Sequence, residues 1–558
     1  MSCKIGGFRV ASALMLLVCM LCWDVKLLAE ESSSYIYMSR KRTPQYYFNE
    51  GEGKAEDGDY ERALELYLLA AYDGHVEAQY KAACLYDRGL GVKKDNKEAA
   101  FWFEKAAEQG HYDAQYRIAC CYKQGIGVAK DYTQAMHWFR RAAEQGDDTA
   151  MCELGIFYAN GVGVEQDYHE AIKWFHSAAE LGFALAQYNL GVCYTKIQGS
   201  ERDYKEAFKW YKLAAEQGHR DAQYLLGQCY ANGNGVTPDV KRAVEWYESA
   251  AMQQDGRAEN ALGVCYEYGK GVDVDYAKAF YWYDCAAKHN NVNAEYNLGH
   301  CYYLGHGVAK DYTKAVEWLE KSAKHGNKEA QFLYGYCNEY GQGISQNYNE
   351  AVYWYREAAK HGQHDAEYNL GHCYYLGHGV IKSFEEAVKW YERAAKHHQA
   401  DAELSLAMCY ELGEGVAVNY ASAKRWYERA AEDGKADAEY HLGDMYHYGR
   451  GVAVDCEKAA EWYRRAANHG QYDAAYSVGV MYEEGDGIAQ NYDEAAMWYR
   501  IAAEHNIAGA EYNLGRCYYL GRGVKQDSIE GENWFMRAAK HGHKEAQDYF
   551  KSRYIFVD

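Results

Sequence analysis

The fifteen residues AEYNLGHCYYLGHGV occupy Ala294–Val308 and return unchanged at Ala366–Val380, 72 positions later. Identical stretches at a fixed spacing indicate a chain built from repeated structural units. The underlying step is shorter, because an alanine recurs every 36 residues from Ala78 to Ala546 without insertion or deletion. We number the positions of each repeat from this alanine, which is offset 0.

Thirteen full repeats cover residues 78–545, and each has Gly at offset 13, Trp at offset 24 and Ala at offset 29. A degenerate first repeat spans residues 42–77. Residues 546–558 are predicted to form a C-terminal capping helix, with Phe550 and Tyr554 at offsets 4 and 8. The array therefore holds about fourteen units.

Each repeat is predicted to be a pair of helices. At about 100° per residue, offsets 0, 4, 7 and 8 lie on one side of a first helix, and offsets 2, 6, 9 and 10 lie on the other. Glycines at offsets 11 and 13 end it. Asp or Asn at offset 17, often with Glu or Gln three residues later, predicts a capping box that begins the second helix, as in Asp95 and Glu98. The second helix is expected to bury offsets 21, 24, 25, 28 and 29.

Glycine at offset 5, as in Gly299, lies inside the first helix and costs about 1 kcal/mol there relative to Ala. We expect close helix packing to offset this cost, with the Trp of offset 24 filling the space left by small residues at offsets 5, 21 and 28.

Composition favours a folded array and restricts its partners. The 558 residues include 58 Tyr, 53 Gly and only 2 Pro, which excludes a proline-rich disordered chain. The net charge of -21 disfavours nucleic acid and anionic lipid surfaces as partners.

The N-terminus has the order of a secretory signal peptide. Lys4 and Arg9 precede an apolar run, Val10–Trp23, and small or polar residues follow from Ala29. We expect a signal peptide at 1–29, a polar linker at 30–41, and export to a periplasm, an endoplasmic-reticulum lumen or the medium. No stable membrane insertion is expected after cleavage, whereas an uncleaved signal would anchor the chain. Three of the 17 cysteines lie in this predicted signal peptide. Most of the others recur at offset 7, on the buried side of the first helix, and are expected to be free thiols.

The order A-x-Y-x-L-G-x-x-Y-x-x-G-x-G-V-x-x-D-Y-x-x-A-x-x-W-Y-x-x-A-A-x-x-G, almost intact from Ala294 and from Ala366, resembles the Sel-one-like repeat, a relative of the tetratricopeptide repeat. The resemblance implies an all-α, right-handed α/α solenoid of about fourteen 36-residue helix pairs, whose first helices line a concave groove. It also implies a role in holding other proteins together. The disulfide-stapled branch of the family has paired cysteines near offsets 29 and 0, where this chain has Ala, so the activities of that branch are not carried over.

The residues do not favour catalysis or a metal. His300, Cys301 and His306 are close in sequence, but on a helix Cys301 faces the core, His300 points away and His306 lies in the loop, so they should not converge on an ion. No metalloprotease, nucleophile-elbow or phosphate-loop motif is present. We therefore predict no enzyme, no cofactor and no metal. A hydrolase assembled from distant residues is the third alternative.

The outer side of the first helix is the candidate binding surface. Offset 2 is usually Tyr, and offset 9 alternates between Glu and Tyr or His over the last eight repeats, which gives a second period of 72. Aromatic and carboxylate groups would line an acidic groove for a basic, apolar protein or peptide. The candidate partner-binding residues are Tyr296, His300, Tyr303, Glu339, Tyr368, His372, Tyr375, Glu411, Tyr440, His447, Glu483, Tyr512 and Tyr519.

Two other interpretations of this stripe stay open. The tyrosines could pack between neighbouring first helices, with the alternation left by duplication of a two-repeat unit. Stacked Tyr faces also suit sugar rings, so an envelope or glycan-binding factor is the alternative to a protein scaffold.

Overall fold

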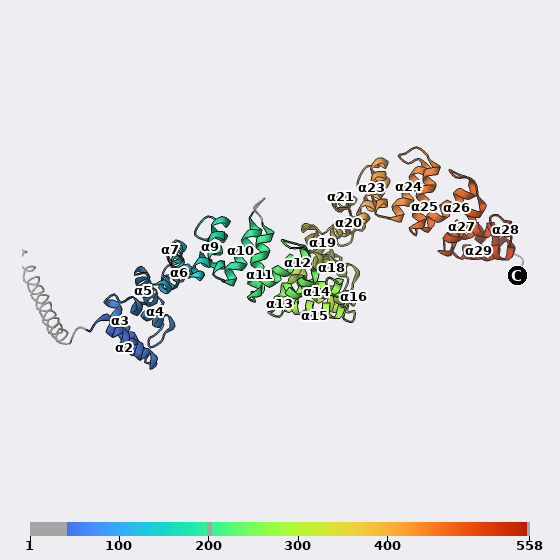
Figure 1. Ribbon diagram of the computed structural model, residues 1–558. Coiled ribbons are helices and arrows are strands. Elements are labelled where there is room, and N and C mark those ends of the chain that lie inside the picture. The colour runs from blue at the N-terminus through green and yellow to red at the C-terminus, as the bar shows by residue number, and fades with distance from the viewer. Residues whose placement is uncertain (1–41, 198–202, 555–558) are drawn as a thin grey trace, which may run out of the picture. The chain divides into compact units, whose positions relative to one another are not determined.

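The computed structural model describes residues 42–197 and 203–554, and within these ranges it contains 29 α-helices and no strand (Figure 1). The predicted all-α solenoid of about fourteen repeats is confirmed. The predicted signal peptide and linker, residues 1–41, lie outside the described residues. Among the helices that are described, none combines the length and the apolarity needed to cross a membrane.

The chain divides into two compact units, with the division inside α14 (Gly256–Tyr268). The helices of the first unit are α2 (Pro44–Glu56), α3 (Tyr60–Tyr72), α4 (Val76–Arg88), α5 (Asn96–Glu108), α6 (Tyr112–Gln124), α7 (Tyr132–Glu144), α8 (Asp148–Asn160), α9 (Tyr168–Glu180), α10 (Ala184–Lys196), α11 (Tyr204–Glu216), α12 (Arg220–Asn232) and α13 (Val240–Ala251).

The helices of the second unit after α14 are α15 (Tyr276–Lys288), α16 (Val292–Leu304), α17 (Tyr312–Lys324), α18 (Lys328–Tyr340), α19 (Tyr348–Lys360), α20 (His364–Leu376), α21 (Phe384–Ala395), α22 (Ala400–Leu412), α23 (Tyr420–Glu432), α24 (Ala436–Tyr448), α25 (Cys456–Asn468), α26 (Tyr472–Glu484), α27 (Tyr492–Glu504), α28 (Ala508–Leu520), α29 (Ser528–Lys540) and α30 (Lys544–Tyr554). Even-numbered helices from α4 to α28 are the first helices of the full repeats, and the odd-numbered helices that follow them are the second.

The predicted ends of the helices are confirmed in the repeat that begins at Ala294. Gly305, at offset 11, ends α16 in the left-handed conformation (φ 83°), and its backbone N–H donates to the Cys301 carbonyl. The Asp311 side chain then caps α17 by accepting from the backbone N–H of Lys314. In this repeat the first helix ends, and the second begins, at the residues that the local sequence predicts.

The capping box forms only in part. The offset-17 side chain caps the second helix as predicted, but its backbone N–H donates to the carbonyl of offset 8 in the first helix. Asp95 and Tyr86 are joined in this way at 3.0 Å, and Asp311 and Tyr302 at 2.9 Å. The Glu three residues after the cap is therefore not needed as an acceptor for the backbone N–H of offset 17. This hydrogen bond, which joins the two helices, closes the loop between them.

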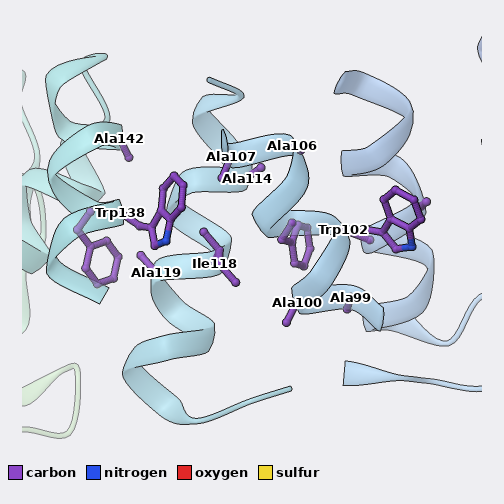
Figure 2. Close-up of a cluster of buried hydrophobic side chains, with 14 of the residues drawn as sticks. Ala99, Ala100, Trp102, Ala106, Ala107, Ala114, Ile118, Ala119, Trp138 and Ala142 are labelled. Carbon is purple, nitrogen blue, oxygen red and sulfur yellow. The ribbon is translucent and has the colours of Figure 1, made fainter. Parts of the chain in front are cut away.

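Small residues at the helix contacts make the core dense. The side chains of Ala351, Tyr355, Ala358 and Ala359 are almost wholly buried, and Trp354 is 8% exposed, as predicted for the second helix. Figure 2 shows the same arrangement in the first unit, where Trp102 and Trp138 lie in one cluster with alanines from several helices.

The Trp of offset 24 joins adjacent repeats. Trp318 packs on a cluster that contains Ala286 from the second helix of the preceding repeat and Leu298 from the first helix of its own repeat. Trp210 occupies the equivalent position in the first unit, beside Phe175 and Leu190. The indole thus packs between neighbouring helix pairs and contacts both.

Our explanation for glycine at offset 5 was wrong about the residue that it faces. A Cβ on Gly371 would lie 2.8 Å from the ring of Tyr391, and one on Gly335 would lie 2.9 Å from the ring of Tyr355. The close neighbour is therefore the side chain of offset 25, and not the Trp of offset 24. The missing methyl makes room for the ring that fills the interior of each repeat.

Glycine at offset 13 has a different role, because it lies against the preceding repeat. Gly307 has a φ of 71°, and a Cβ there would lie 2.0 Å from the carbonyl oxygen of Tyr276, at the start of α15. Neither the conformation nor the space admits another residue without rearrangement. This contact fixes how closely consecutive repeats stack.

Candidate partner-binding surface

The offset-2 tyrosines of the predicted site pack on the second helix of their own repeat. The ring of Tyr368 lies 5.9 Å from that of Tyr391, the ring of Tyr440 lies 5.6 Å from that of Tyr463, and the ring of Tyr512 lies 5.3 Å from that of Phe535. Burial raises the pKa of Tyr296, the fourth of the set, to about 12. These rings are half-buried, so only part of each ring is open to a partner.

The carboxylates at offset 9 are engaged inside their repeats. Glu339 and Glu411 are buried and accept hydrogen bonds of 2.6 Å from the hydroxyls of Tyr355 and Tyr427. Glu483 accepts from Tyr499 at the same distance. In each case the tyrosine is at offset 25, so the acid of the first helix holds the polar end of the central ring.

The aromatic residues at offset 9 reach the next repeat. The Tyr303 hydroxyl donates to Gln342 Oε1 at 2.8 Å, and the Tyr375 hydroxyl donates to Glu414 Oε2 at 2.8 Å. His447 Nε2 lies 3.9 Å from Asp486 Oδ2. Tyr519, at 37% exposure, is the most open member of the set.

His300 and His372, at offset 6, are partly buried beside the offset-2 tyrosines. Their rings lie 5.7 Å from Tyr296 and 6.1 Å from Tyr368. Burial lowers the pKa of both imidazoles. The structure therefore brings the predicted residues together along the first helices, and many of them also make contacts within the solenoid.

The alternation at offset 9 is matched by the residue 39 positions later, at offset 12 of the following repeat. A Glu is followed by a basic residue, and a Tyr or His is followed by an acid or Gln. The pairs are Glu267 with His306, Tyr303 with Gln342, Glu339 with His378, Tyr375 with Glu414, Glu411 with Arg450, His447 with Asp486, and Glu483 with Arg522.

Contacts at several junctions show why the two positions vary together. Glu411 Oε1 lies 2.9 Å from Arg450 Nη1, and Glu267 Oε1 lies 3.9 Å from His306 Nδ1. With the two tyrosine bonds above, these contacts make four of the junctions chemically complementary. The 72-residue period is therefore expressed in the structure as two alternating kinds of junction.

A second ladder of buried polar groups, at offset 1, was missed by sequence reasoning. In the first unit it is Gln in every full repeat but one, which has Met151, and Gln79 Oε1 accepts from Gln109 at 2.7 Å while its amide donates to the Ala71 carbonyl. In most repeats of the second unit it is Glu. Glu295 is wholly buried between His325 Nδ1 at 2.7 Å and Lys321 Nζ at 3.0 Å.

This ladder changes the interpretation of the residue at offset 31. His325 does not simply follow the end of α17, because its ring binds the carboxylate of offset 1. The paired switch from Gln–Gln to Glu–His along the sequence was the signal that could have revealed the contact.

The most exposed part of the stripe is offset 10, which the list of predicted site residues omits. In the second unit this position carries large apolar side chains whose exposure runs from 41% at Leu304 to 63% at Tyr268. We call this set the offset-10 row; it consists of Tyr268, Leu304, Tyr340, Leu376, Leu412, Tyr448 and Leu520. Only Glu484 interrupts it, whereas the same position in the first unit is polar.

Comparisons with known proteins identify the repeats. The Sel1 repeat model matches fourteen segments, at residues 33–75, 76–111, 113–147, 148–183, 184–219, 220–255, 256–291, 292–327, 328–363, 364–398, 400–435, 436–471, 473–507 and 508–543. The comparison with curated proteins gave no match.

Two of the similar solved structures show the relationship. One is c5321, a protective antigen of uropathogenic Escherichia coli strains with an SLR fold; it is 32% identical, with 82% of this chain and 91% of that chain covered and a TM-score of 0.62. The other is a Sel1 repeat protein from Oxalobacter formigenes, 30% identical over 55% of this chain and 90% of that chain, with a TM-score of 0.47. Because fourteen segments match the Sel1 repeat model and the helix pairs recur every 36 residues, this chain belongs to the Sel1 repeat family.

Proposed function

We propose that this protein is a non-enzymatic scaffold that binds a protein or peptide along the offset-10 row of its second unit. Proteins of the Sel1 repeat family are generally protein-interaction scaffolds. Binding along the offset-10 row is supported by the row itself, a series of exposed large apolar side chains at one repeat position. Such series are a common feature of docking surfaces.

The row also fits the way in which repeat arrays bind. Its members recur at one position per helix pair, so an extended partner could contact each repeat in turn. Tyr side chains supply rigid contact area with a polar tip, and Leu supplies apolar area. The half-buried Tyr303 and Tyr375 and the exposed Tyr519 border the row as neighbours at offset 9.

The charge of the chain indicates the character of the partner. With 81 acidic and 60 basic residues, the protein attracts basic segments over its surface as a whole. A partner segment that combines Lys or Arg with apolar side chains therefore fits the row best.

The test is a crosslinking pull-down in which the purified full-length chain is the bait and an extract of its native host supplies the candidate partners. The row variant carries Tyr340→Ser, Leu376→Ser and Leu412→Ser. A matched control carries Tyr281→Ser, Tyr353→Ser and Met497→Ser, which removes equally exposed apolar groups from second helices. The proposal expects a partner that the wild type and the control both recover and that the row variant loses.

Equal recovery by all three proteins, each with the same helix content by circular dichroism, would place binding elsewhere. Loss from the control as well as from the row variant would indicate nonspecific apolar adhesion.

Export of the protein is a separate proposal, supported by the charged, apolar and polar order of residues 1–34. Mass spectrometry of the protein from its host tests it. A mature N-terminus at Glu30 would support cleavage, and an intact N-terminus would support an anchor instead.

A further inference from the structure

Three side chains of different chemistry converge at one junction of the second unit. His447 lies in the last turn of α24, Cys456 is the first residue of α25, and Asp486 lies in the loop after α26. One donor atom from each residue lies within 4.8 Å of the other two. All three side chains are partly buried; the His447 and Asp486 side chains are 25% and 39% exposed.

His447 and Cys456 occupy positions that hold an aromatic pair in two related repeats. At offsets 9 and 18, Tyr303 contacts Tyr312 with ring centroids 5.2 Å apart, and Tyr375 contacts Phe384 at 5.1 Å. The repeat that begins at Ala438 has His and Cys at these two positions, and no other repeat has Cys at offset 18. Two packing residues have thus been exchanged together for two metal-ligand types.

The third ligand comes from the pairing between repeats. A Tyr or His at offset 9 is followed by an acid or Gln at offset 12 of the next repeat, which here is Asp486. Its carboxylate lies 3.9 Å from the His447 imidazole and within 4.8 Å of the Cys456 sulfur. The Nδ1 atom of His447 is buried and has no hydrogen-bond partner among the described residues.

We propose that His447, Cys456 and Asp486 bind one divalent transition-metal ion of the zinc class, at the junction between the repeats that begin at Ala438 and Ala474. Imidazole, thiolate and carboxylate are the three ligand types that zinc takes from proteins. Bonds of about 2.0–2.3 Å place such donors roughly 3.3–3.7 Å apart around a tetrahedral ion. The His447–Asp486 distance of 3.9 Å is close to this range, and donors up to 4.8 Å apart would have to approach by about 1 Å on binding.

The ion would tie one repeat to the next. Two ligands belong to one repeat and the third to the following repeat, so binding crosslinks their contact as the Tyr–acid hydrogen bond does at the sister junctions. Three protein ligands leave a fourth position for water or for a donor from another molecule.

Cobalt(II) is the probe, because thiolate ligation to it gives a charge-transfer absorption band. The full chain, purified without a histidine tag and stripped of metal under reducing conditions, is titrated with Co²⁺, and Zn²⁺ is then used to displace it. We expect one equivalent of Co²⁺ with a thiolate band that Zn²⁺ abolishes. Absence of the band in the wild type would overturn the proposal.

The ligand variants assign the site. Cys456→Ser should abolish the band, and His447→Tyr and Asp486→Asn should each weaken Co²⁺ binding at least tenfold. Cys285→Ser, which changes a partly buried thiol outside the cluster, should leave the band unchanged. An unchanged band in Cys456→Ser would assign the metal to another cysteine and refute the site.

A double variant guards against simple misfolding. His447→Tyr with Cys456→Tyr recreates the Tyr303–Tyr312 pair, so it should fold like the wild type and bind no Co²⁺. Addition of Zn²⁺ should raise the melting temperature of the wild type but not that of this variant. Equal stabilisation of both would contradict binding at this junction.

Discussion

The carboxylate of Glu411 lies 2.9 Å from the guanidinium of Arg450, which is 39 positions later in the next repeat. Glu411 is buried and is also bonded to Tyr427. A like charge in the place of Arg450 would therefore be costly. Because the two junction types alternate, two adjacent repeats could not be exchanged without mismatched charges, although their helices have the same length and sequence pattern.

Deletion of repeats tests this relationship. Removing residues 366–401 would place Glu339 opposite Glu414, whereas removing residues 366–437 would place Glu339 opposite Arg450. We expect the shorter deletion to be the less stable protein by about 1–3 kcal/mol, because the buried Glu339 would face a second carboxylate and not a cation. Denaturant unfolding followed by circular dichroism measures the difference.

The control for this prediction is a repair of charge. Glu414→Arg in the single-repeat deletion restores an acid–base pair with Glu339 and should recover most of the stability. If the single deletion is as stable as the double deletion before repair, the junctions carry no register information.

The buried acid of offset 1 gives a second prediction. His325→Ala removes the imidazole that lies 2.7 Å from Glu295 and leaves that carboxylate with Lys321 alone. We expect a loss of about 1–3 kcal/mol in the free energy of unfolding. The double variant Glu295→Gln/His325→Gln copies the Gln79–Gln109 pair and should be close to wild type.

The measurement is a double-mutant cycle in denaturant. Independent, additive effects of the two substitutions would show that the residues do not interact.

Trp354 tests the packing between repeats. It is 8% exposed, and its indole nitrogen is buried without a hydrogen-bond partner among the described residues. Trp354→Ala should cost about 3–5 kcal/mol by leaving a cavity between helix pairs. Trp354→Phe should cost less than half of that, because it keeps an aromatic ring and removes the unpaired N–H. A loss below about 1 kcal/mol for the alanine variant would show that this indole is not important for stability.

Thiol reactivity reports on the offset-7 cysteines. Burial raises the pKa of Cys301 and Cys373 to about 12, so their thiolate fraction at neutral pH is very small in the folded chain. Iodoacetamide at pH 8 should label the partly buried Cys285 first and should label the other two only after unfolding or at strongly alkaline pH. Peptide mapping by mass spectrometry measures the order, and equal labelling of all three in the native chain would contradict it.

The repeat length, the helix pairs and most of the core could be predicted from sequence because they depend on local signals. The glycine at offset 11, the cap at offset 17 and the apolar spacing of each helix act within a few residues. Contacts between helices were harder to predict. Periodicity placed both Trp354 and Tyr355 in the core, but it could not tell which of the two faces Gly335.

The candidate surface shows the same limit. Glu339 and Glu411 were predicted as groove residues because they lie on the outer side of a helical wheel, yet both are buried and bonded to Tyr355 and Tyr427. Contact between a partner and the thirteen candidate residues stays a prediction. The exposed offset-10 row was inside the predicted stripe, but only side-chain exposure separated it from its neighbours.

The sequence by itself determined the repeat, the helix boundaries and the family, because each depends on residues close together in the chain. The tertiary structure decided which polar groups meet: Glu295 with His325 inside one repeat, and Glu411 with Arg450 and Asp486 with His447 and Cys456 across two repeats. These partners lie 30 to 39 residues apart, and their contacts exist only when the helices of a repeat pack together and one helix pair stacks on the next.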